Sequence, residues 1–156
     1  MTSQNSGADQ YKKLKDKYGL PGLQELEREF SLGAIEENQP VLRQILVKMN
    51  EKQEEVLKLL KEVIQPENNF PSLYEAESFD EEEKKNVFEL FKKISCMNKE
   101  LIITDLDYDE KKAANQIIKT LDEWKVHKPE LLKIVNKTRA SWKNKKKTRL
   151  DLEYFG

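Results

Sequence analysis

The sequence has very little of what small catalytic or metal-binding domains depend on. Its 156 residues include one cysteine, Cys96, and one histidine, His127. A lone cysteine excludes an internal disulfide and a cysteine-based zinc site, and a lone histidine cannot build a metal cluster. No glycine-rich phosphate loop or paired-carboxylate pattern stands out. We therefore expect no enzymatic activity, cofactor or metal site, with His127 on the surface or lining a kink at Pro129 and Cys96 as a small buried residue.

Glycine, proline and long apolar runs are scarce as well. There are five glycines and five prolines, while charged residues make up 37% of the chain. This composition favours long helices. No apolar run approaches the ~20 residues of a membrane span, and the polar first ten residues lack a signal-peptide core. We expect a soluble, cytoplasmic protein without membrane contact.

Apolar residues recur at helical spacing in three long segments. The first lies between Asn38, a predicted N-cap, and Pro66. The second starts at Asp80, which is placed to form a capping box with Glu83. The third is expected over 109–143. The predicted fold class is all-α: an antiparallel bundle of three long helices, with short N-terminal helices and a basic C-terminal extension.

The last long segment carries a heptad seam over 114–142, in which apolar positions alternate at steps of three and four residues. Pro129 interrupts the segment and should remove one helical hydrogen bond. Because the seam keeps its phase across Pro129, we favour one kinked helix, with a split into two helices as the alternative. The seam is either part of the core or a self-association surface.

The shorter segments complete the predicted organisation. Residues 11–18 and 22–31 are expected to form short helices, and 66–79 a loop held to the bundle by apolar residues. Residues 101–106 have strand-like propensity, but they lack a second β-rich segment to pair with, so we expect helix there. In the turn that follows, Asp107 or Asp109 should cap the last helix.

The predicted domain organisation has three parts. Residues 1–9 form a flexible tail, 10–142 a single helical-bundle domain, and 143–156 a basic and aromatic C-terminal tail.

Charge is segregated along the chain although the total is only −1. Residues 111–149 contain 13 Lys and Arg against three acids, a net of +10, so the remainder carries −11. Such a helix presents its charge to nucleic acid, to an acidic partner or to acidic parts of its own fold. The acidic run 75–83 is a candidate for that last role.

The C-terminal segment provides the predicted binding residues. We expect a non-enzymatic adaptor that binds a protein partner, with lysines supplying long-range attraction and aromatic residues supplying the anchor. The alternative is a nucleic-acid-binding or ribosome-associated protein that uses the same lysines on phosphates. The predicted contacting residues are Trp142, Lys143, Lys145, Lys146, Lys147, Arg149, Tyr154 and Phe155.

Overall fold

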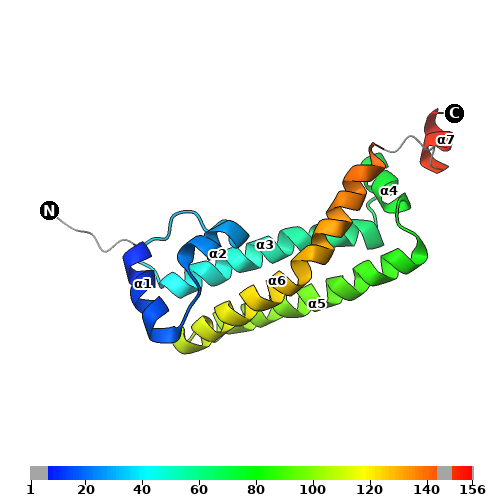
Figure 1. The fold of residues 1–156 in the computed structure, drawn as a ribbon. Helices are drawn as coiled ribbons and strands as arrows, with labels where there is room; N and C mark the ends of the chain where they lie inside the picture. Colours follow the sequence, from blue (N-terminus) through cyan, green and yellow to red (C-terminus); the bar gives the residue numbers. More distant parts are fainter. Residues whose placement is uncertain (1–6, 144–148, 156) are drawn as a thin grey trace. The chain divides into compact units, whose positions relative to one another are not determined.

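The computed structural model describes residues 7–143 and 149–155, and within the second range the side chains of residues 149 and 151–153. These residues form seven α-helices and no strand (Figure 1). The helices are α1 (Gly7–Tyr18), α2 (Leu23–Phe30), α3 (Val41–Ile64), α4 (Phe70–Glu77), α5 (Glu81–Leu106), α6 (Glu110–Ser141) and α7 (Arg149–Phe155).

The all-α class and the three long, closely packed helices are confirmed. The helical assignment of 101–106 is also confirmed, because α5 continues to Leu106. The expected loop at 66–79 is wrong in its centre, where α4 forms. Residues 7–9 belong to α1, although they were expected in the N-terminal tail.

The chain divides into two compact units, each assembled from distant parts of the sequence. Unit 1 comprises residues 1–54 and 96–124, and unit 2 comprises 55–95 and 125–156. The helices α3, α5 and α6 contribute residues to both units. The sequence predicted a single domain over 10–142 and indicated no such division.

The core of unit 1 is formed where α2 packs with parts of the long helices. The Phe30 and Trp124 rings lie 5.3 Å apart, and the Trp124 Nε1 donates to Glu29 Oε1 at 3.1 Å. Tyr11 of α1 is also buried, and burial raises the pKa of its hydroxyl to about 12. The other large buried side chains include Leu26, Leu42, Ile45, Met49, Leu101, Ile117 and Leu121.

The core of unit 2 joins α4 to the ends of the long helices that belong to this unit. Its buried side chains include Leu60, Val63, Tyr74, Ala76, Phe79, Val87, Leu90, Ile94, Leu131 and Ile134. Apart from Tyr74, all of them are hydrocarbon side chains. Their burial therefore removes apolar area from water and leaves no side-chain polar atom without a hydrogen-bond partner.

Local sequence signals explain where the helices of unit 2 begin. Asp80 Oδ1 accepts from the Glu83 backbone N–H at 2.7 Å, and Glu83 Oε1 accepts from the Asp80 N–H at 3.0 Å, so the predicted capping box is confirmed. For α4, the Asn69 side chain accepts from the Ser72 N–H at 3.0 Å, and proline follows in the first turn.

The last long helix starts as predicted and does not split. Asp109 Oδ2 accepts from the Lys112 backbone N–H at 2.9 Å, which confirms the predicted cap. The helix α6 continues through Pro129 as one element of 32 residues. Of the heptad seam, Ala114, Ile117, Leu121, Trp124 and Leu131 are buried, whereas Val135 and Trp142 are exposed.

Candidate binding surface at the end of α6

The structure describes three of the eight predicted binding side chains. Trp142 and Lys143 directly follow α6, and Arg149 is the first residue of α7. Lys145, Lys146 and Lys147, and the side chains of Tyr154 and Phe155, lie outside the described residues. The candidate surface is therefore built from unit 2 residues around Trp142.

Trp142 is fixed in place by helix α4. Its ring stacks on that of Tyr74 with centroids 4.5 Å apart and an interplanar angle of 23°, and the Phe70 ring lies 6.5 Å away. The Trp142 Nε1 donates to Glu75 Oε2 at 2.7 Å. Even so, 48% of the residue is exposed. Three side chains of α4 thus contact the indole while about half of the residue's surface remains exposed.

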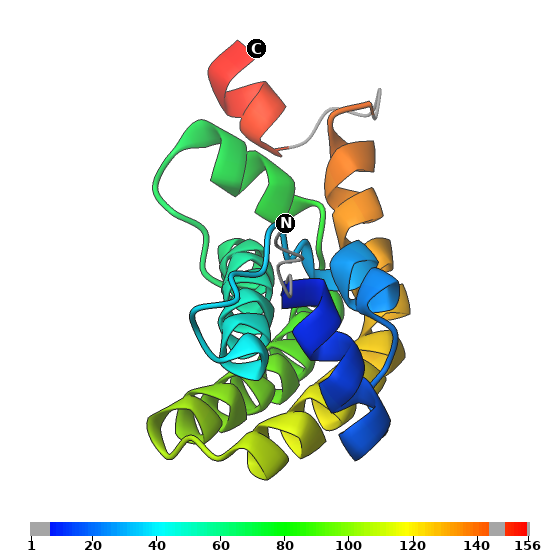
Figure 2. The same cartoon turned by 90° about the vertical axis from the view of Figure 1, so that its left-hand side faces the viewer.

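Tyr74 connects α4 to the C-terminal part of the chain. Its hydroxyl donates to the Ser141 carbonyl at 3.3 Å and lies 3.5 Å from the Asp151 carboxylate. Burial and then the Asp151 charge raise the pKa of Tyr74. Glu77 accepts from the Arg149 backbone N–H at 2.8 Å, and both views show α7 beside α4 (Figures 1 and 2). The C-terminal segment is therefore attached to α4 on both sides of residues 144–148.

Acidic side chains of unit 2 balance part of the positive charge. Glu83 binds Lys137, and hydrogen bonds from Lys137 and from the Asp80 backbone N–H lower the pKa of Glu83. Arg149 binds Glu77 and Glu153. The acidic run at 75–83 thus contacts the basic end of the chain within unit 2, as one of the sequence alternatives held.

Some other cations on α6 and directly after it have no acidic partner among the described residues. Within the described residues, Lys133, Arg139 and Lys143 make no ion pair with an acid. All three are exposed. Arg139 precedes Trp142 by three residues, about one helical turn, and Lys143 directly follows Trp142, so both cations lie close to the indole along the chain. We call Arg139, Trp142 and Lys143 the α6-end surface.

The sequence missed the part of the site that comes from α4. Tyr74, Glu75 and Glu77 position Trp142 and Arg149, but the segment that contains them was interpreted as a loop. The pair Asn69 and Pro71 carried a usable signal, since an N-cap residue followed by proline in the first turn is typical of a helix start.

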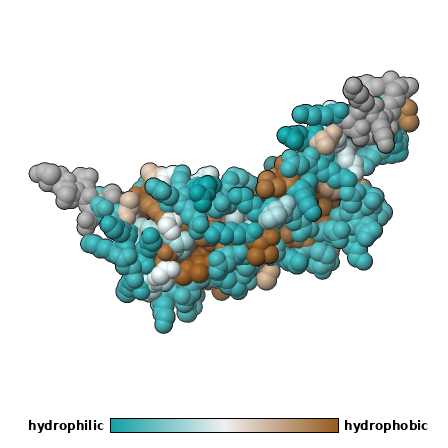
Figure 3. Space-filling view, viewed as in Figure 1, coloured by the Kyte–Doolittle hydropathy of each residue, from teal (hydrophilic) through white to brown (hydrophobic). Residues whose placement is uncertain are grey.

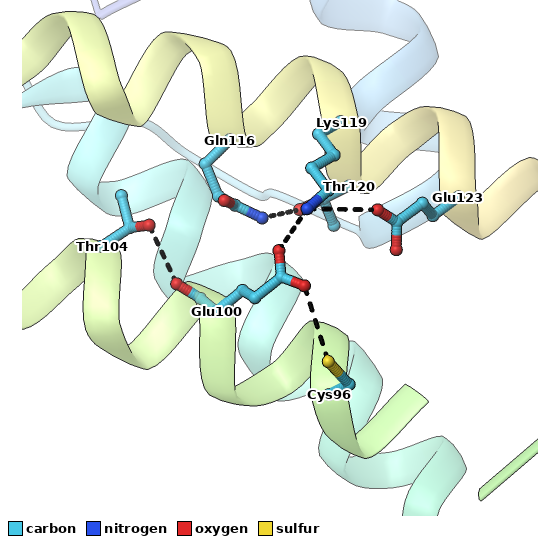
Figure 4. Close-up of polar contacts among 7 residues, drawn as sticks. All are labelled: Cys96, Glu100, Thr104, Gln116, Lys119, Thr120 and Glu123. Atoms are coloured by element: carbon cyan, nitrogen blue, oxygen red, sulfur yellow. Dashed lines mark hydrogen bonds and ion pairs between the residues drawn. The ribbon is translucent and has the colours of Figure 1, made fainter. Parts of the chain in front are cut away.

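A second polar cluster lies in unit 1 and joins α5 to α6 (Figure 4). Lys119 Nζ donates to Glu100 Oε2 at 2.6 Å and lies 3.7 Å from Glu123 Oε1. The bond to Glu100 and the negative charge of its carboxylate raise the pKa of Lys119. The Cys96 thiol lies 3.7 Å from Glu100 Oε1, and Cys96 is exposed, so the expectation that it is buried is wrong.

The reason for the Cys96 error is its place on the helix. The side chains of Ile94, Met97 and Leu101 form the buried face of α5, whereas Cys96 lies beside that face and toward Glu100. Because Lys119 is held as an ammonium ion, it is not available as a base near neutral pH. The cluster therefore acts as an ionic link between two helices.

Unit 2 also has a groove between α5 and α6, with a volume of about 470 Å³. Val126, which is 73% exposed, and Pro129 border it, and Phe79, Val87 and Ile134 form its base.

Hydrophilic residues cover most of the face in Figure 3, and the apolar patches on it are separate. His127, predicted on the surface or lining the kink at Pro129, is half-buried in α6.

Two further properties concern the described residues as a group. They include no set of three or more His, Cys, Asp or Glu side chains arranged to hold a metal ion. None of their helices combines the length and the apolar character needed to cross a bilayer.

Comparisons with known proteins gave no relative from which a function could be transferred. No family model, curated protein or solved structure matches the chain.

Proposed function

We propose that this chain is a non-enzymatic binding protein whose unit 2 binds nucleic acid through the α6-end surface. The observation that carries the proposal is that Arg139 and Lys143, three residues before and one residue after the exposed Trp142, are themselves exposed and have no acidic partner among the described residues. Phosphate groups bind such cations without needing a matching apolar pocket.

The charge of unit 2 supports a polyanionic ligand. Unit 2 contains 16 Lys and Arg against 13 acids, whereas unit 1 contains 12 against 16. Unit 2 is therefore net positive at +3 and unit 1 net negative at −4. Within unit 2, residues 125–149 carry ten cations and one acid, Glu130. A concentrated field of one sign raises the association rate of an oppositely charged ligand.

The position of Trp142 favours nucleic acid over the protein anchor that the sequence suggested. An anchor side chain inserts into a pocket of its partner, where it becomes fully buried. Trp142 is held against Tyr74 and bonded to Glu75, so it cannot leave α4 without losing both contacts. A fixed and half-exposed ring offers a flat surface instead.

Binding of labelled single-stranded RNA and DNA between ~50 and 200 mM salt tests the proposal. We expect affinity to fall linearly with salt on logarithmic axes, and the double variant Arg139→Gln/Lys143→Gln to reduce the slope by about 1.4, or ~0.7 per lost phosphate contact. The matched control is Lys99→Gln/Lys111→Gln, which removes two exposed charges of unit 1 that likewise make no ion pair within the described residues. Absence of binding at the lowest salt, or equal slopes for both variants, refutes the proposal.

Protein binding remains a second candidate because of the groove between α5 and α6 of unit 2. Its apolar base and the 73% exposed Val126 suit a helical segment of a partner. A photo-crosslinker at position 126 should capture one recurrent protein that a crosslinker at 111 does not capture, and the purified pair should then bind. If position 126 captures nothing specific, this candidate fails, whatever the nucleic-acid result.

A further inference from the structure

We infer that the nucleic acid is single-stranded and that one of its bases stacks on Trp142. This inference rests on the proposed function and adds the kind of nucleic acid and the contact that selects it. It uses only described residues of unit 2.

The first step is that α4 orients the indole before any ligand arrives. The stack on Tyr74 and the hydrogen bond from Nε1 to Glu75 Oε2 restrain both the plane and the edge of the ring. Tyr74 is in turn buried and bonded to the Ser141 carbonyl, so the support is itself fixed. A ring that is already ordered loses little entropy when a base stacks on it.

The second step is that Trp142 is exposed although it has partners. The other tryptophan of the chain, Trp124, also bonds a glutamate through Nε1 and contacts an aromatic ring, but it is only 5% exposed. Two tryptophans with similar partners thus differ mainly in how much of the ring reaches solvent. The open surface of Trp142 is the feature that a planar ligand would use.

The hydrogen-bonding edge of the indole is already occupied by Glu75. Because Glu75 accepts from Nε1, that edge is not available for reading a base, and the free part of the ring can offer only stacking. Stacking tolerates every base, so we expect weak sequence preference.

Single strands and duplexes differ in whether the face of a base can reach the ring. In a duplex each base is stacked between its neighbours, so a surface aromatic ring cannot reach its face, whereas an unpaired base can be splayed out onto such a ring. Arg139 and Lys143 lie three residues before and one residue after Trp142, so they supply positive charge for the phosphates next to a stacked base. Glu75 and Glu77 of α4 repel phosphates and would direct the strand along α6.

Tryptophan fluorescence provides the test. We would titrate the full chain and the Trp142→Ala and Trp142→Phe variants with a 12-nucleotide thymidine homopolymer, a 12-base-pair duplex and inorganic polyphosphate. Stacking should quench the Trp142 emission only with the single strand. The Trp142→Ala variant should bind it roughly tenfold or more weakly with an unchanged salt slope, and Trp142→Phe should recover part of that loss.

The outcomes separate this inference from the proposed function. If none of the three ligands binds at ~50 mM salt, both fail. If duplex and polyphosphate bind as tightly as the single strand, and Trp142→Ala binds like the parent chain, the basic surface stands and the stacking inference is overturned. If Trp142→Ala weakens all three ligands equally and Trp142→Phe recovers nothing, Trp142 only supports the fold of unit 2, and the inference is likewise overturned.

Discussion

Gln53 is the residue of this chain that departs furthest from the usual rules of a protein core. It lies on α3 and is fully buried, and within the described residues neither its Oε1 nor its Nε2 has a hydrogen-bond partner. An unpaired buried amide costs about 1–3 kcal/mol relative to its hydration in water. Three residues earlier on α3, the Asn50 side chain accepts a hydrogen bond from Asn98 of α5 at 3.2 Å, so another polar side chain of this helix does have a partner.

Replacing Gln53 with leucine should therefore stabilise the protein. We expect Gln53→Leu to raise the free energy of unfolding by about 1–3 kcal/mol, because the two side chains are similar in size and the unpaired amide is removed. Urea unfolding should show a higher midpoint with an unchanged slope.

The paired control is Gln53→Ala, which removes the same amide but leaves a cavity. It should be less stable than Gln53→Leu by about 2 kcal/mol or more. A Gln53→Leu variant that is less stable than the parent chain would show that the amide is satisfied in solution, for instance by a buried water.

At the scale of secondary-structure elements, the start of α5 couples helix capping to an ion pair. Glu83 accepts from the Asp80 backbone N–H and also binds Lys137 of α6, so one carboxylate serves the end of one helix and the contact with another. Both donors lower the pKa of Glu83 from its ordinary value of 4.5. A carboxyl group with a lowered pKa contributes stability above its ordinary pKa, and that contribution is lost as the pH falls through the lowered value.

Glu83→Gln should consequently destabilise the protein at pH 7 and make no difference in acid. The glutamine keeps an acceptor for the capping box but loses the charge that binds Lys137, so we expect a loss of about 0.2–1 kcal/mol at pH 7. The difference from the parent chain should shrink as the pH falls below 4.5 and disappear once Glu83 is protonated in the folded state. Urea midpoints measured at several pH values provide the measurement.

The control for this prediction is Glu81→Gln, which removes a charge from the same helical turn that makes no ion pair within the part of the chain that the structure describes. A difference as large and as pH-dependent as that of Glu83→Gln would mean that the helix dipole, not Lys137, lowers the pKa of Glu83.

The elements differ in how far the sequence could predict them. All three long helices have stripes of apolar residues, and Asp80 and Asp109 cap the starts of α5 and α6, so local signals locate them. The start of α3 was less well predicted, because it begins at Val41, three residues after the expected N-cap Asn38. The eight residues of α4 are too few to show a helical stripe, and aromatic residues next to proline and asparagine are equally typical of an anchored loop. That error also hid Tyr74, Glu75 and Glu77, the residues that position the candidate site.

At the scale of the whole molecule, the described basic residues of 111–149 fall into two groups that the composition alone does not distinguish. Part of the basic segment is paired within the fold, as between Lys137 and Glu83, and part is exposed without an acidic partner, as at Arg139 and Lys143. A paired cation and an unpaired cation look the same in the sequence. The sequence gives the number of charged residues but not which of them form ion pairs. Only the three-dimensional arrangement separates the cations that bind acids from those left to a ligand.

For the heptad seam of α6, the two alternatives are a place in the core of the fold and contact with a second copy of the chain. The burial of Leu121 gives a prediction that separates them. Leu121 is 3% exposed within unit 1. A carboxylate at this position would be buried without a partner, so Leu121→Asp should unfold the protein or cost several kcal/mol. Val126→Asp on the exposed side of the same helix should change stability by no more than about 0.5 kcal/mol.

Far-UV circular dichroism with urea and light scattering together decide how the seam is used. Loss of helix at low urea in Leu121→Asp, with Val126→Asp like the parent chain, makes the seam core. If Leu121→Asp instead keeps its helical signal and changes only the mass in solution from two chains to one, the seam mediates self-association. Because Ala114, Ile117 and Trp124 are buried along with Leu121, a second copy could reach the part of the seam in unit 1 only by opening that unit, and we expect the first result.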